Sequence, residues 1–149
     1  MTTIRGMLEK VQSVNVRDEA INIIRSTEKQ NIDLNRKQLY QKSIDSEGNN
    51  LRLYSSALYA LEKERRNPLP GFMRPDLYNT GAFQLKFFAV VTSKDIVYGS
   101  SDVKSSALEA KYGGKIFGLT KENKAIYSLD VVYPLLQNVI TQKTGLKFK

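Results

Sequence analysis

The sequence predicts an α+β fold in which a small antiparallel sheet is covered by helices. Apolar residues recur at helical spacing near both ends of the chain, whereas they alternate with other residues over 83–91. A short turn and a second apolar run follow this alternation. Helices before and after a single β-hairpin are typical of the α+β class. We expect the hairpin to span about residues 83–98.

The length is that of one domain, residues 1–149. A chain of 149 residues can bury a core of ordinary size. Its hydrophobic fraction of 41% and charged fraction of 26% are ordinary for a globular protein. Within this domain we expect an N-terminal helical arm over residues 1–44 and a core over residues 45–149.

The first part of the chain predicts two helices. Apolar residues at helical spacing indicate a short amphipathic helix over residues 3–12. A second helical pattern begins at Ala20 and continues more weakly to Leu39, where the intervening polarity indicates a narrow buried stripe. Turn-forming residues at 45–50 end this helix.

A third helix is predicted after this turn. Ser55 or Ser56 can cap it, and Ala57, Leu58 and Leu61 would form its apolar stripe. The basic residues at its C-terminal end lie where positive charge is favoured. We expect this stripe to face the core.

A proline-containing loop, residues 67–76, follows the third helix. Fixed φ angles and missing N–H donors predict an extended surface loop. Arginines flank it, and such a loop suits partner binding because arginine is enriched at interfaces and a stiff loop loses little entropy on docking. A solvated helix end explains these arginines equally well. Our candidates for partner or oligomer contacts here and in the first helix are Met7, Val11, Arg65, Arg66, Pro68, Pro70, Phe72 and Arg74.

The clearest strand pattern lies in residues 83–91, and residues 92–95 form a turn before the chain returns at 96–98. Two strands alone are only marginally stable. We therefore expect a third or fourth strand from residues 50–54, from residues 77–80 or from a neighbouring subunit.

Two helices follow the hairpin. One of the serines at 100–101 can cap the first, which ends at the glycines of 113–114. Thr120 can cap the C-terminal helix, Pro134 should kink it, and Gly145 ends it.

The composition excludes several classes of enzyme. The chain has no His and no Cys, so it cannot form a Ser-His-Asp triad, a Cys-His pair or a zinc site with imidazole or thiolate ligands. Ser101, Lys104 and a later Lys-Thr-Gly triplet also occur in penicillin-recognising serine enzymes, but the middle Ser-Asp-Asn element is missing. We expect no catalytic residue, no cofactor and no metal.

The formal charge of +8 lies mostly in the second part of the chain. Moderate basicity indicates contact with a polyanion, although a solvated basic surface is an equally good explanation because no long run of like charges occurs. An aromatic residue beside cations can grip a nucleic acid. The C-terminal candidates for such contact are Lys143, Lys147 and Lys149. No apolar run is long enough to span a bilayer, so we expect no membrane partner.

Two short motifs carry a family resemblance. One precedes the hairpin and the other precedes the C-terminal helix, and their matching residues are Leu77, Thr80, Gly81, Phe117, Gly118, Leu119 and Thr120. In this order, over about residues 45–145, the chain resembles the neck and tail-completion proteins of tailed bacteriophages, the small head–tail joining components. The family often has a His-Gln pair and a Pro-x-Arg segment around the second motif, whereas this chain has Tyr-Gly-Gly-Lys at residues 112–115.

The resemblance implies a structural virion protein of the neck or tail that is assembled in the cytoplasm of the bacterial host. Its partners would be copies of itself in a six- or twelve-fold ring, the portal or adaptor protein, and tail proteins. The ring would surround the DNA channel, where the C-terminal lysines could contact packaged DNA without reading its sequence. Locally, Thr80 and Gly81 should turn the chain into the strand, and Phe117 should anchor the second motif. The alternative is a small basic protein that binds nucleic acid non-specifically.

Overall fold

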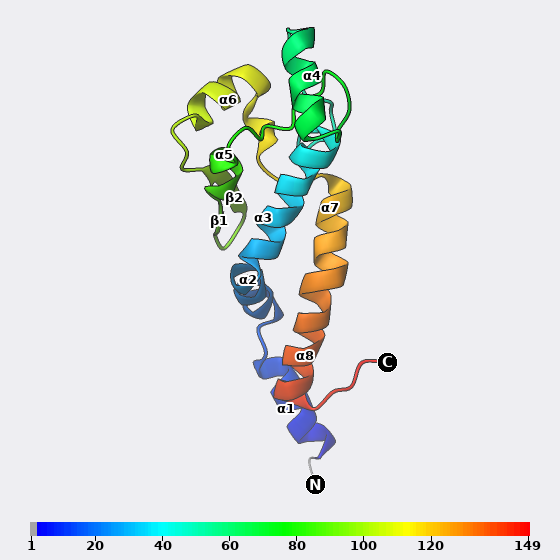
Figure 1. Cartoon of the computed structure of the whole chain (residues 1–149). Coiled ribbons are helices and arrows are strands. Elements are labelled where there is room, and N and C mark those ends of the chain that lie inside the picture. The colour runs from blue at the N-terminus through cyan, green and yellow to red at the C-terminus, as the bar shows by residue number, and fades with distance from the viewer. Residues whose placement is uncertain (1–2) are drawn as a thin grey trace.

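Helices that run along a long axis dominate the computed structural model, which describes residues 3–149. In Figure 1, α1, α2 and α3 climb one side of the molecule, α7 and α8 descend beside them, and the hairpin lies on the other side of α3. In chain order the elements are α1 (Ile4–Ser13), α2 (Val16–Ser26), α3 (Glu28–Lys37), the π-helical η1 (Gln38–Lys42), α4 (Ala57–Arg66), α5 (Ala82–Leu85), β1 (Phe87–Val91), β2 (Ile96–Ser100), α6 (Ser105–Tyr112), the 3-10 helix η2 (Gly114–Ile116), α7 (Lys121–Ile126), the π-helical η3 (Tyr127–Val132) and α8 (Tyr133–Thr144). This confirms the α+β class with a small antiparallel sheet.

The N-terminal helices follow the predicted pattern. Thr3 caps α1, since its Oγ1 accepts a hydrogen bond of 3.2 Å from the Gly6 N–H. The second predicted helix is divided at Thr27 into α2 and α3. The predicted narrow stripe is confirmed, and the buried residues along it are Ile23, Thr27, Asn31, Ile32, Asn35, Gln38 and Leu39. By contrast, α1 buries no residue.

The core lies between α3 with η1, the inner face of the hairpin and the chain around η2. Three aromatic rings meet there, with centroids 5.0 Å apart for Phe83 and Phe87 and 5.4 Å apart for Phe87 and Phe117. The buried residues of the core are Ile32, Leu39, Leu51, Leu77, Phe83, Phe87, Ala89 and Ile116. Helices from residues 1–44 thus supply part of the same core as residues 45–149.

The hairpin begins later than predicted. Residues 83–85 belong to α5, and the strands pair from Phe87 with Ser100 to Val91 with Ile96. The prediction was wrong because Phe83 and Phe87 are four residues apart, a spacing that suits one turn of helix as well as an alternating strand. Phe83 in α5 and Phe87 at the start of β1 are both buried.

The sheet of the described residues has two strands. Residues 50–54 and 77–80 do not form the expected extra strand, because their only ladder contact is the isolated bridge between Ile44 and Asn50. Proline-rich chain and left-handed backbone around residues 67–81 interrupt regular pairing there. A strand from a neighbouring subunit stays a prediction.

Two details of the middle helices differ from the predictions. Ser56 does cap α4, but Leu58 is 81% exposed, and Ala60 and Lys63 are the buried residues of this helix. The predicted apolar stripe of α4 is therefore wrong. A different face of the helix is buried, because Lys63 on that face pairs with a buried carboxylate described below.

The start predicted for α6 is also wrong. The helix begins at Ser105 rather than after residues 100–101, and Asp102 Oδ1 accepts a hydrogen bond of 3.0 Å from the Lys104 N–H before it. A hydrogen bond from a backbone N–H to a nearby aspartate side chain favours a turn, and here this turn at Asp102 precedes the helix in place of a cap by Ser100 or Ser101. The predicted end at Gly113 is confirmed.

The C-terminal helix begins and ends as predicted. Thr120 Oγ1 accepts a hydrogen bond of 3.2 Å from the Asn123 N–H, and Gly145 follows α8. Pro134, where we predict a kink, lies at the start of α8 directly after η3. A π-helical turn is a common way to accommodate such an irregularity. Over residues 3–149, no helix combines the length and the apolarity needed to cross a bilayer.

Candidate functional site

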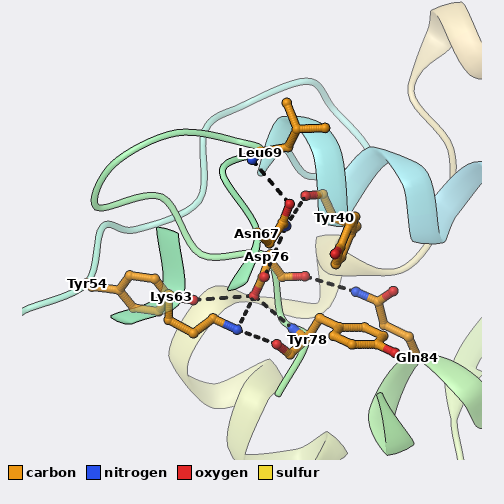
Figure 2. A network of polar contacts seen from close by, with 8 residues as sticks. All are labelled: Tyr40, Tyr54, Lys63, Asn67, Leu69, Asp76, Tyr78 and Gln84. Carbon is orange, nitrogen blue, oxygen red and sulfur yellow. Dashed lines mark hydrogen bonds and ion pairs between the residues drawn. The ribbon is translucent and has the colours of Figure 1, made fainter. Parts of the chain in front are cut away.

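A buried carboxylate organises the end of the molecule that carries the proline loop. Lys63 Nζ lies 2.8 Å from Asp76 Oδ1, and the two side chains are only 8% and 3% exposed. Asn67 Nδ2 donates to Asp76 Oδ2 at 3.2 Å, and the Tyr78 N–H donates to Oδ1 at 3.0 Å. Figure 2 shows these groups converging on Asp76 from several segments. We call Lys63, Asn67, Asp76 and Gln84 the Asp76 hub.

The hub joins elements that are distant in sequence. Gln84 Nε2, from α5, donates to the Asp76 carbonyl oxygen at 2.9 Å. Asn67 Nδ2 also donates to the Tyr40 carbonyl oxygen of η1 at 3.1 Å. Lys63 Nζ, from α4, also donates to the Tyr78 carbonyl oxygen. The loop between α4 and α5 is thereby held against both helices and η1.

A cavity of about 490 Å³ lies beside the hub. Its aromatic wall includes Tyr54 and Tyr59, whose ring centroids are 5.0 Å apart in an edge-to-face arrangement. Burial, followed by the nearby charge of Asp76, raises the pKa of the Tyr54 phenol above its ordinary value. The phenol therefore stays protonated near neutral pH, and its hydroxyl donates to Asp76 Oδ1 at 3.5 Å.

The groups at this cavity offer contacts for binding. The carboxylate of Asp76 is paired with Lys63 and accepts hydrogen bonds from Asn67 and from the Tyr78 N–H, so it is engaged within the protein. In residues 3–149, no group of three or more acidic side chains is placed to hold a metal ion. Aromatic rings and protonated phenols offer stacking surface and hydrogen bonds, which are the contacts that protein partners use.

The first motif forms one wall of this cavity. Leu77 is buried with a left-handed backbone, φ 52°, and Gly81 has φ 84°. This left-handed φ favours glycine at position 81, and a Cβ there would also lie 2.7 Å from the Tyr78 hydroxyl oxygen, so the tyrosine ring would have to move. Thr80 Oγ1 accepts from the Ala82 N–H at 3.4 Å. The predicted turn is present, but it leads into α5 rather than into a strand.

The second motif is held by polar side chains of α3 and η1. Asn35 Nδ2 donates to the Ile116 carbonyl oxygen, and the Gly118 N–H donates to Asn35 Oδ1, both at 3.1 Å. The Thr120 N–H donates to Gln38 Oε1 at 2.9 Å. These contacts place Leu119 in the interior, where it is buried.

Sequence reasoning missed these polar residues. Asn31, Asn35 and Gln38 recur at helical spacing, and all three are buried. Polar residues at core spacing are an available signal, because a buried amide needs a specific partner. The partner segment lies about 80 positions away in sequence. Phe117 behaves as predicted, since it packs against the core rings.

The candidate contact residues divide between two ends of the molecule. Met7 is half-buried and Val11 is exposed on α1, at one end. The candidates at the other end lie on or after α4 and are Arg65, Arg66, Pro68, Pro70, Phe72 and Arg74. Arg66 pairs with Glu62, and Arg74 Nη2 donates to the Lys42 carbonyl oxygen at 2.8 Å. Phe72 and Arg65 are exposed.

The lysines proposed for contact with a polyanion lie at the α1 end. Lys143 forms an ion pair with Glu19 of α2. Lys147 and Lys149 are exposed in the segment that follows α8. Only the last two are therefore free of an ion pair among residues 3–149.

Comparison with protein-family models, with curated proteins and with solved structures finds no match. The geometry of the two ends and the sequence motifs therefore carry the functional argument.

Proposed function

We propose that this chain is a structural, non-enzymatic component of the head–tail junction of a bacteriophage. In this proposal it assembles with copies of itself into a ring between the portal and the tail, around the DNA channel of the virion. Ring formation requires head-to-tail contacts between two different surfaces of the same protein. The observation that carries the proposal is the exposure of apolar side chains at both ends of an elongated chain (Figure 1).

The two surfaces are chemically suited to such contacts. At one end, α1 buries no residue, and Ile4, Leu8 and Val11 follow one another at helical spacing with exposed side chains. At the other end, Leu58 of α4 and Phe72 of the proline loop are exposed. Exposed apolar groups that cluster rather than scatter are typical of protein–protein contact surfaces.

The resemblance motifs support the same proposal. Their residues fix turns, a helix cap and core packing, which are the tasks of a scaffold rather than of a reactive centre. The net charge of +8 suits weak contact with the backbone of packaged DNA.

The test is the assembly state of the full chain, alone and mixed with a portal or adaptor protein. Sedimentation velocity and negative-stain images should show six- or twelve-fold rings in at least one of these samples. Leu8→Ser should weaken ring formation, whereas the matched exposed change Lys10→Ser should not. A chain that stays monomeric in every mixture and binds duplex DNA with a steep salt dependence would favour the alternative, non-specific binding of nucleic acid.

A further inference from the structure

The two edges of the β-hairpin differ in how their backbone groups are satisfied. The Thr92 N–H donates to the Asp95 carbonyl oxygen at 2.9 Å, which closes the hairpin and sets the alternation of the ladder. The backbone groups of Ala89 and Val91 therefore point away from β2. The Ala89 N–H donates to Glu28 Oε1 at 3.1 Å, and the Val91 carbonyl oxygen accepts from Arg25 Nη2 at 3.4 Å. Side chains of α2 and α3 thus cover the β1 edge.

The β2 edge is open. By the same alternation, the backbone N–H and C=O groups of Tyr98 and Ser100 point away from β1. Within residues 3–149, none of these groups has a hydrogen-bond partner at that edge. An unpaired strand edge is a template for pairing with another extended segment.

A groove runs beside this open edge. Its volume is about 420 Å³, and it lies between β2 and the π-helical η3. Apolar and aromatic groups dominate its lining, notably Ile24, Ile96, Tyr98, Phe117, Tyr127 and Val132. A strand added to β2 would place every second side chain in this groove.

Residues 145–149 have the pattern that such a position requires. They leave α8 after its last turn, form no helix or strand, and are exposed. Apolar and basic residues alternate over Leu146, Lys147, Phe148 and Lys149. In an extended conformation, Leu146 and Phe148 project to one face and the two lysines to the other. One face is thus apolar, like most of the groove lining, and the other, basic face suits solvent.

The segment cannot occupy the groove of its own chain along its full length. The helical path from Thr144 back to Tyr127, beside which β2 lies, is about 26 Å at the usual rise per residue. Five extended residues reach about 17 Å. The same segment of a second copy is not limited by this distance.

We propose that residues 145–149 of a second copy add to β2 as a third strand, with Leu146 and Phe148 seated in the groove between β2 and η3. This inference rests on the proposed function, because it adds, to the exposed stripe of α1 and the end that carries Leu58 and Phe72, a further pair of surfaces through which neighbouring copies join. The contact is heterologous, since the donated segment and the accepting edge are different surfaces, so its repetition closes a ring when the geometry allows. Main-chain hydrogen bonds supply affinity and the two apolar anchors supply register.

A first experiment weakens the donated strand in the full chain. Leu146→Asp combined with Phe148→Asp should weaken self-association at least tenfold in sedimentation velocity. Leu53→Asp, the same change at another exposed leucine, should leave it unchanged. Unfolding by denaturant should be unaltered by either change, because all three side chains lie outside the core. Equal self-association of the double variant and the wild type would overturn the proposal.

A second experiment locates the contact by disulfide cross-linking. The sequence has no cysteine, so only the introduced cysteines can form a disulfide. Val97 is 53% exposed on the outer face of β2, and Lys147 would project to the same face of the added strand. Directly opposed residues of neighbouring strands bring their Cβ atoms close enough for a disulfide. A mixture of chains with Val97→Cys and chains with Lys147→Cys should form a mixed disulfide dimer.

The single variants are the controls. Val97→Cys chains that cross-link mainly with one another would show β2 edges pairing directly, and would overturn the proposal. Rings that form normally while the mixture yields no mixed disulfide would also overturn it, yet would leave the proposed function standing. Failure of every sample to assemble, with any partner, would overturn both.

Discussion

The two ends of this molecule differ in which side chains they bury. The hub end, made of the Asp76 hub and the two motifs, buries charges and amides and satisfies them with specific partners. The terminal end, made of α1, α8 and residues 145–149, buries only Thr144 and leaves apolar side chains exposed. Specific burial makes the first end intolerant of change. Incomplete burial makes the second available to a partner.

This difference follows from how polar groups behave in the interior. A buried ion pair is costly to desolvate, so Lys63 and Asp76 are tolerated only because further hydrogen bonds complete their coordination. The apolar stripe of α1 has no such requirement. The apolar side chains of this stripe can be buried against any surface of suitable shape, and a second copy can supply such a surface.

The largest expected effect is at the hub. Asp76→Ala leaves the Lys63 ammonium buried without its counter-charge, and should lower the free energy of unfolding by about 3 to 5 kcal/mol in denaturant titrations. Glu62→Ala removes an exposed ion pair with Arg66 from the same helix, and should cost no more than about 1 kcal/mol. Similar losses for the two variants would contradict the contrast between buried and exposed pairs.

The next effect concerns the polar face of α3. Asn35→Ala leaves the Gly118 N–H and the Ile116 carbonyl oxygen buried without partners, and should lower the free energy of unfolding by about 2 to 4 kcal/mol. Gln30→Ala changes an exposed amide on the same helix and is the matched control. If both variants unfold at the same denaturant concentration, Asn35 does not hold the second motif.

Local signals in the sequence predicted local features of this fold. Ser56, Thr120 and Gly145 cap or end helices as expected, because capping depends on residues within one helical turn. Phe83 was misplaced because its spacing from Phe87 satisfies both a helix and a strand. In the structure Gly81, with a left-handed backbone, directly precedes the helical turn that contains Phe83.

Long-range contacts explain what local reasoning missed. Lys63 is buried on α4 because it pairs with Asp76 at the far end of the proline loop, and no local sequence pattern indicates that pair. The same holds for Asn35 and Gln38, whose partners are in the second motif. Placing Lys63 inward rotates α4 and exposes Leu58, so one unpredicted ion pair also explains the wrong stripe.

A smaller effect at the hub end is its dependence on alkaline pH. The pKa of Tyr54 is raised in the folded state, so its protonated phenol adds stability that is present below about pH 10 and is lost as the pH rises further. Tyr54→Phe should reduce this alkaline loss of unfolding free energy, and should remove a late-titrating component from the ultraviolet absorbance. Tyr133→Phe, at an exposed ring, should leave both unchanged.

The smallest effect on stability is expected at the terminal end. Its size tests whether α1 belongs to the folded core. Leu8→Ala changes an exposed side chain, so the free energy of unfolding should fall by less than about 0.5 kcal/mol. Leu39→Ala, the same change at a fully buried leucine, should cost about 2 to 5 kcal/mol. Sedimentation of the folded variants should give the opposite order. Leu8→Ala should weaken assembly more than Leu39→Ala, because Leu8 contributes to contacts between copies and Leu39 does not. A Leu8 variant that unfolds as easily as the Leu39 variant would show that α1 is part of the folded core, and the division into two ends would fail.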